Sequence, residues 1–250
     1  MTINGRVHSN SDLKIGGNNK VLNAGVTYTI SDAIGGGSTF RPGYPAQVPT
    51  QPWPIGPYTT SQFPCNWYWN GAAGGLTVNN LSGGSKDFNV DSNGPWWVGG
   101  TKASARLQPG VYCAHNGKLN LNTSGVDGSA GVTFVVDGVD GQIDATFHDV
   151  KPFDYVPTPP LLPTDPHNVL FFNAGGKSSK QAISWTIDGG GTWLGWIYAP
   201  GDGTGSIKIS GGSASTLTGG IFGDTVKLAG GGWSFTGTGP TGGFTSGMTE

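Results

Sequence analysis

The sequence predicts an all-β protein: a right-handed parallel β-helix, or solenoid, forming a single domain over residues 1–250. The main observation is a phrase that recurs near the C-terminus. Residues 185–199 read WTIDGGGTWLGWIYA, and residues 207–223 read IKISGGSASTLTGGIFG. Each copy has a short apolar segment of alternating pattern, a glycine-rich turn, and a second apolar segment that ends in Gly-x-Ile-aromatic.

The spacing of the repeat gives the length of one structural unit. Ile187 and Ile209 are 22 residues apart, and Ile197 and Ile221 are 24 residues apart. A third, shorter copy begins at Val226-Lys-Leu228. A period of this length, built from strand-sized pieces, is typical of solenoids, in which stacked coils share a core that no single coil can bury alone.

Glycine content is the second observation. The chain has 46 Gly and 17 Pro residues, and the glycines lie between β-branched and aromatic residues rather than in polar tracts. We interpret them as corner residues, because a tight corner needs a positive φ or a missing Cβ. The apolar residues show no helical period of 3.6. With 35% hydrophobic residues, the chain is able to fill a core.

Strand-like signals divide the chain into three parts. They lie at residues 3–34, at residues 107–147, and from residue 167 into the C-terminal repeats. Excursions rich in proline and aromatic residues separate these parts, at about 41–100 and 151–166. Clustered prolines cannot be carried by a central strand, because proline has no N–H to donate. We therefore expect both excursions to lie outside the stacked strands.

Charged residues are sparse and exclude some classes of function. The chain has 13 Lys and Arg residues against 15 Asp and Glu residues, a net charge of −2. No basic stripe with interleaved aromatic residues is present, which argues against a nucleic-acid partner. No apolar run of about 18 residues is present, so the sequence predicts no membrane-spanning helix.

The two cysteines, Cys65 and Cys113, have two interpretations. In an exported protein they pair as a disulfide that ties a long excursion to the stacked strands, whereas in the cytosol they are two small buried residues. The first interpretation is favoured. Two cysteines do not supply a structural zinc site, and the chain has no CxxC motif.

Three segments resemble a known family. Residues 3–19, INGRVHSNSDLKIGGNN, are similar to a recurring start, G-x-V-H-S-N-x-D-I-x-I-x-G, of β-solenoid domains in bacterial TadG-like and PilX-like pilus-assembly proteins. The step LQPGVY at 107–112 and the closing segments at 193–200 and 207–228 also resemble that family, whereas the proline-rich excursions have no counterpart. The resemblance implies a location in the bacterial cell envelope. It implies no catalytic residue, because the family has no established catalytic motif.

Five aromatic residues form a candidate ligand-binding cluster: Trp67, Tyr68, Trp69, Trp96 and Trp97. One interpretation is a stacking platform for sugars or an adhesive patch. The other, which is favoured, is a local core that holds the excursion against the strands, because aromatic side chains bury a large area. Several of them exposed together would favour the platform, since large exposed apolar patches usually have a partner.

The sequence offers one candidate metal site and one polar cluster. Asp137, Asp140 and Asp144 are separated by glycines, and such oxygen ligands suit calcium, although a plain Asp-Gly turn is the favoured interpretation. Calcium is the one cofactor that we consider. The segment from His8 to Asp12 is either a small cation site or, as favoured, a set of hydrogen bonds that cap the open end of the solenoid.

We expect a non-enzymatic extracellular module with a structural or adhesive role, whose partners are other cell-surface or pilus proteins or a surface polysaccharide. Self-assembly stays open. One alternative is a carbohydrate-binding or lyase-like β-helix protein. Its proton-abstracting base would be Arg106 and its calcium-binding acidic cluster the Asp137–Asp144 segment, which are the only combination to nominate. Another is an ice-binding solenoid, because Thr192 and Thr216 occupy equivalent repeat positions.

Overall fold

The computed structural model describes fifteen segments of the chain, and every structural statement below concerns these. They are residues 2–16, 26–35, 46–49, 63, 65–70, 87–89, 107–115, 118–138, 141–153, 168–173, 183–187, 191–199, 206–211, 216–229 and 234–236. This part of the chain forms eighteen β-strands and no α-helix. The prediction of an all-β fold is confirmed.

The strands have the following bounds. They are β1 (Thr2–Ser9), β2 (Asp12–Ile15), β3 (Val26–Tyr28), β4 (Ser31–Ile34), β5 (Ala46–Gln47), β6 (Trp67–Asn70), β7 (Asp87–Asn89), β8 (Gly110–His115), β9 (Lys118–Gly128), β10 (Val132–Asp137), β11 (Gln142–Val150), β12 (Val169–Asn173), β13 (Ile183–Ile187), β14 (Thr192–Ala199), β15 (Ser206–Gly211), β16 (Thr216–Gly223), β17 (Thr225–Ala229) and β18 (Ser234–Thr236).

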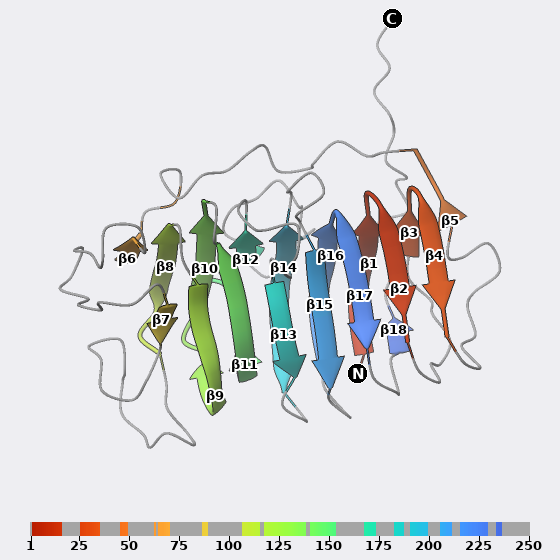
Figure 1. The fold of residues 1–250 in the computed structure, drawn as a ribbon. Coiled ribbons are helices and arrows are strands. Elements are labelled where there is room, and N and C mark those ends of the chain that lie inside the picture. The colour runs from red at the N-terminus through yellow and green to blue at the C-terminus, as the bar shows by residue number, and fades with distance from the viewer. Residues whose placement is uncertain are drawn as a thin grey trace, which may run out of the picture.

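Parallel pairing organises the strands into two ladders. The first ladder runs β6-β8-β10-β12-β14-β16-β1-β3-β5. The second ladder runs β7-β9-β11-β13-β15-β17-β2-β4. In Figure 1 the second ladder lies in front of the first, and its strands point the opposite way. Successive strands along the chain alternate between the two ladders, except that β5 and β6 both belong to the first, and β18 pairs with β1.

The N-terminal strands continue the ladders beyond the C-terminal repeats. Strand β1 pairs with β16 in one register from Thr2↔Thr216 to Ser9↔Gly223, the register that β14 also uses with β16. The three strands read TINGRVHS, TWLGWIYA and TLTGGIFG. They share Thr, Gly, a β-branched residue and a small residue at matching positions. The first strand of the chain is therefore a further copy of the C-terminal repeat.

Columns of apolar side chains fill the space between the ladders. In the first ladder, register places a column of buried side chains one above another: Trp67, Tyr112, Phe134, Phe171, Ile197, Ile221, Val7 and Val26. The matching column of the second ladder contains Ile143, Ile183, Ile207, Val226 and Leu13. Burying each such side chain contributes about 1.5–3 kcal/mol.

The outer face of the first ladder is buried as well. A second cluster there consists of Phe63, Val111, Cys113, Val135, Val169, Phe172, Trp196, Tyr198 and Phe222. The described ends of both proline-rich excursions reach this face. The ring of Phe63 lies 5.7 Å from that of Phe172, and the Phe153 amide donates to Thr133 Oγ1 at 3.1 Å. The excursions contribute apolar side chains at these ends, which explains why strands such as β12 are buried on both faces.

The disulfide predicted from the sequence is present. Cys65 and Cys113 are bonded, and 48 positions of the sequence separate them. The bond joins Cys65, two residues before β6, to the middle of β8, the partner of β6 in the first ladder. The excursion between them is thereby fixed at both ends to one part of the ladder.

One column of the first ladder requires glycine. Gly195 and Gly219 are paired, with φ of 103° and 148°, a region that side-chain-bearing residues rarely adopt. A Cβ on Gly219 would lie 1.9 Å from the carbonyl oxygen of Gly195. The close approach of the two backbones leaves no room for a side chain.

We predict that Gly219→Ala lowers the free energy of unfolding by about 3 kcal/mol, through backbone strain and overpacking. The measurement is chemical denaturation followed by tryptophan fluorescence. Gly16→Ala is the matched control, because its Cβ would lie 3.8 Å from the nearest atom, and it should change stability by less than about 0.5 kcal/mol. Equal stability of the two variants would contradict the proposed backbone contact.

We also predict that replacing both Cys65 and Cys113 by serine lowers the free energy of unfolding by about 4 kcal/mol. The bond closes a loop of 48 positions. The expected loss of stability corresponds to the chain entropy that this closure removes from the unfolded state. Calorimetry of the variant and of the reduced wild-type protein should give the same lowered midpoint. An unchanged midpoint in both would show that the bond adds nothing to stability.

Candidate interaction surface

The outer face of the second ladder is polar over β15, β17 and β2, and its character there follows from strand alternation. In β15 the side chains of Ile207 and Ile209 are buried, so Lys208 between them points to the opposite face. The same alternation holds for Lys227, between Val226 and Leu228, in β17. In β2 it holds for Lys14, which follows the buried Leu13.

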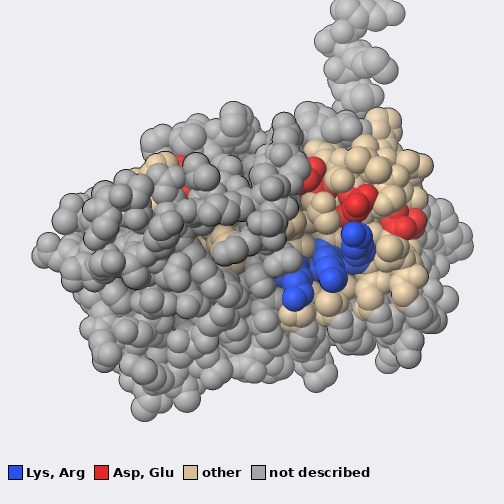
Figure 2. Space-filling model, viewed as in Figure 1, with Lys and Arg blue, Asp and Glu red and all other residues tan. Residues whose placement is uncertain are grey.

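Register brings these three lysines into one row. Lys208 pairs with Lys227, and Lys227 pairs with Lys14. Neighbouring strands lie about 4.8 Å apart, so the row carries one ammonium group per strand spacing. Lys227 and Lys14 are exposed, and Lys208 is half-buried. We call Lys208, Lys227 and Lys14 the lysine row. Figure 2 shows cationic side chains gathered on this face.

Small and polar residues flank the lysine row. Two positions before the lysines, the paired residues are Ser206 and Thr225, and two positions after them they are Ser210 and Ala229. Acidic side chains border the row on one side in Figure 2. Asp12 is one of the acids, and its Oδ1 accepts a hydrogen bond from Ser31 Oγ at 2.6 Å. In the described part of the chain, no ion pair joins the three lysine amines to a carboxylate.

The lysine row was missed by the sequence analysis, although a signal was available. The tripeptides Ile207-Lys-Ile209, Val226-Lys-Leu228 and Leu13-Lys-Ile15 have one pattern, with lysine between two β-branched or aliphatic residues. The first two also lie at equivalent repeat positions. The third is at the other end of the chain, and only the pairing of β17 with β2 places it beside them.

The polar segment from His8 to Asp12 forms the corner between β1 and β2. Ser9 Oγ donates to the carbonyl oxygens of Asp12 and Asp224, at 2.9 and 2.7 Å. The Asn10 amide donates to the Gly223 carbonyl at 2.9 Å. These bonds connect the β1–β2 corner to the preceding β16–β17 corner.

The prediction that this segment caps an open end of the fold is wrong. Strand β1 lies between β16 and β3, and β2 lies between β17 and β4. The residues were assigned to an end because they are first in the sequence. Their hydrogen bonds satisfy corner carbonyls inside the ladders instead, and both His8 and Ser9 are buried.

His8 is the buried titratable group of this corner. Its Nδ1 lies 2.7 Å from Thr27 Oγ1, and its Nε2 lies 2.7 Å from Asn10 Oδ1. The ring of Phe222 packs against it with 4.6 Å between ring centroids. Burial lowers the pKa of His8 below 6.5, and the hydrogen bond to Asn10 offsets this only in part.

The candidate calcium ligands do not form a described cluster. Asp137 ends β10 and pairs with the ring of His115, and its charge together with burial raises the pKa of Tyr68. Asp140 lies outside the described residues, as does the side chain of Asp144 in β11. Among the residues that the structure describes, no group of three potential metal ligands occurs. Calcium binding stays a prediction.

The aromatic cluster is only partly described. Trp67 is 7% exposed and stacks on Tyr112 with 4.3 Å between ring centroids, so it belongs to the core and not to an exposed platform. Tyr68 is half-buried beside the second cluster. The side chain of Trp69, with Trp96 and Trp97, lies outside the described residues. The platform stays a prediction for those three.

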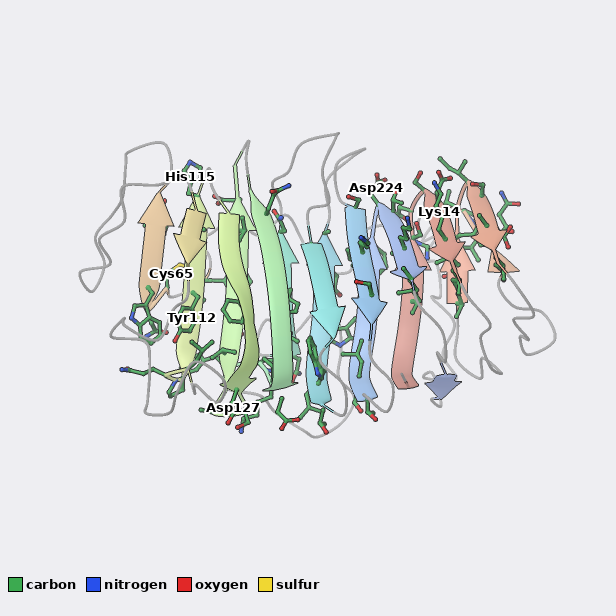
Figure 3. The ribbon with its side chains drawn as sticks, turned by 60° about the horizontal axis from the view of Figure 1, so that its bottom comes forward. Lys14, Cys65, Tyr112, His115, Asp127 and Asp224 are labelled. Atoms are coloured by element: carbon green, nitrogen blue, oxygen red, sulfur yellow. A yellow bond between two sulfur atoms is a disulfide. The ribbon has the colours of Figure 1, made fainter. Side chains whose placement is uncertain are left out.

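The remaining candidates are placed as follows. Arg106, nominated for lyase chemistry, lies outside the described residues. Thr192 and Thr216 are paired in the first ladder, and Thr2 extends their column. Two residues further along the same strands, the equivalent positions hold Leu194, Thr218 and Asn4. The described threonines of the ladder therefore form one column, without a second column of threonines beside it. Figure 3 shows Lys14 and Asp224 toward the opposite end of the ladders from Cys65 and His115.

Comparison with protein-family models, curated proteins and solved structures finds no match to the chain. None of the described elements is a helix of the length and apolar character that crossing a membrane requires. The resemblance to pilus-assembly solenoid domains therefore stays a prediction.

We predict that the protein loses stability as the pH falls through about 6.5, the ordinary pKa of histidine. Because the folded-state pKa of His8 is lowered, the unfolded state binds more protons in this range, so the free energy of unfolding rises with pH. Urea midpoints at about pH 5.5 and 7.5 measure the effect.

The variant His8→Phe provides the control. Phenylalanine suits the column, because His8 pairs in register with Phe222 and that residue with Tyr198. The variant should show a smaller change of midpoint between the two pH values than the wild-type protein. An identical change in both proteins would assign the pH dependence to other groups.

Proposed function

We propose that the chain is a right-handed parallel β-helix that serves as a non-enzymatic structural or adhesive module outside the cell, at the bacterial envelope and in contact with pilus or other surface components. The observation that carries the proposal is the continuity of the two parallel ladders. They run through the C-terminal repeats into the N-terminal strands without a change of register at β16 and β1.

Continuous ladders favour a mechanical role. Each inner strand is hydrogen-bonded to a strand on both sides, and the side chains of equivalent positions stack between the ladders. Stacked coils of a solenoid contact only their neighbours and form an extended, stiff surface, which is suited to recognition of other long molecules.

The disulfide supports the extracellular location. Bonds of this kind persist in oxidising compartments and are rare in the cytosol, where thiols are kept reduced. Cys65–Cys113 attaches a long excursion to the first ladder. An extracellular protein under shear benefits from such a covalent tie, because the excursion is held even when its packing opens.

Strand β4 is the last described strand of the second ladder. Its residues support binding of a partner on the faces of the ladders rather than addition of a further strand at this end. Asp32 pairs with Leu13 and occupies the position that the buried column fills in the other strands. It is exposed, as are its neighbours Ser31 and Ala33. An inward-pointing charge on an edge strand disfavours addition of a further strand. The polar outer face over β15, β17 and β2 is then a described surface that is available to a partner.

The test is a paired assay of binding and catalysis. We expect the purified chain to co-sediment with insoluble envelope polysaccharide or assembled pili, and to release neither unsaturated nor reducing sugars on prolonged incubation. Protein unfolded by reduction and urea, then returned to buffer with its thiols blocked, is the control for adhesion that needs the fold. Sugar release by the folded chain would overturn the proposal in favour of the enzyme.

A further inference from the structure

We infer that the lysine row, Lys208–Lys227–Lys14, binds a linear polysaccharide that carries a carboxylate on each successive sugar. This inference rests on the proposed adhesive function and names the partner class of its contact surface. The juxtaposition that carries it is three ammonium groups on three consecutive strands of the second ladder.

Like charges in register need a compensating partner. Residues of equal charge placed directly opposite on neighbouring strands destabilise a sheet. The chain nevertheless places three lysines in one row, and none of their amines forms an ion pair with a described carboxylate. A polyanion laid along the row would neutralise all three ammonium groups at once, which no single small anion could do.

The geometry of the row favours a polymer with a short, regular charge repeat. Parallel strands fix the spacing of the lysines at about 4.8 Å along the ladder. A chain of acidic sugars carries carboxylates at a regular interval along its length, so several of them can neutralise the lysines of the row together. The row is perpendicular to the strands, so the polymer would lie along the ladder axis.

The residues beside the row leave room for such a chain. On the side toward the C-terminal ends of the strands, the neighbours of the row are small. Ser210 and Ala229 follow two residues after Lys208 and Lys227, and Gly16 follows two residues after Lys14. On the other side lie the hydroxyls of Ser206 and Thr225 and the carboxylate of Asp12. This carboxylate repels an anionic polymer, so the polymer is expected on the small-residue side.

Two other polyanions fit less well. An anionic membrane surface is recognised by larger basic clusters, typically of four to eight residues. The lysine row has three cations beside acids, and its described flanks are small or polar. Single-stranded nucleic acid is held by aromatic stacking platforms beside basic groups, and the described flanks of the row contain no aromatic residue.

Polygalacturonate is the probe for the experiment, and its fully methyl-esterified form is the matched uncharged polymer. The full chain is immobilised and binding is measured across a range of salt concentrations. We expect binding to polygalacturonate and at least tenfold weaker binding to the ester. Affinity should fall as salt rises, because a polyelectrolyte releases counterions when lysines neutralise it.

Substitutions locate the site. The variant K14Q/K208Q/K227Q should bind polygalacturonate at least tenfold more weakly and with a shallower salt dependence, by about one unit of slope per lysine. The single variant Lys227→Gln, at the centre of the row, should weaken binding several-fold. Lys151→Gln, which removes a described lysine outside the row, should bind as the wild-type protein does. Because the substitutions are on the surface and remove repulsion between like charges, the thermal midpoints of the variants should not fall below that of the wild-type protein.

Several outcomes would overturn the inference. They are equal binding of the triple variant and the wild-type protein, equal binding of the acid and ester polymers, or binding of the wild-type protein to anionic phospholipid vesicles but not to polygalacturonate. These outcomes leave the adhesive function standing if the chain still co-sediments with envelope material. Cleavage of polygalacturonate by the wild-type protein would instead overturn the proposed function itself.

Discussion

In-register parallel stacking is the constraint on which the rest of the structure depends. From β13 to β17 each strand lies over a neighbour in an unbroken register, so a residue type chosen at one position is repeated along a column. Isoleucine or valine at the inward position gives a continuous core, as in Ile183, Ile207 and Val226. The same rule makes a glycine column where two backbones approach, and it makes the lysine row on the opposite face.

This constraint also explains why the N-terminal strands pair with the C-terminal repeats. The open side of β16 and β17 would expose apolar columns if the ladder stopped there, because Ile221 and Leu228 have no neighbour beyond them among the C-terminal repeats. Strands β1 and β2 cover both with Val7 and Ile15. The hydrogen bonds of Ser9 and Asn10 then connect the two corners. A covering strand of matching sequence is more effective than a polar cap, since it continues both the hydrogen bonds and the core.

The two outer faces of the ladders have different roles for a physical reason. Aromatic residues and the ends of the excursions cover the outer face of the first ladder. Together they form a second hydrophobic core on that face. The second ladder alternates buried apolar residues with hydroxyls and lysines, as a sheet does when one face meets solvent. A partner that recognises a side chain repeated along a ladder is therefore expected to bind the outer face of the second ladder.

The sequence by itself determined the all-β class and the strand positions in the C-terminal repeats, because these depend on local alternation and glycine placement. It favoured a disulfide between its two cysteines without deciding it. It did not determine which strands are neighbours. The place of β1 beside β16, the burial of His8 and the union of Lys14 with Lys208 and Lys227 required the tertiary structure. Pairing between chain ends is a non-local contact that no local pattern specifies. Residues 13–15 carry the same apolar-Lys-apolar pattern as the two repeats, but only the stacked ladders turn three separate lysines into one row.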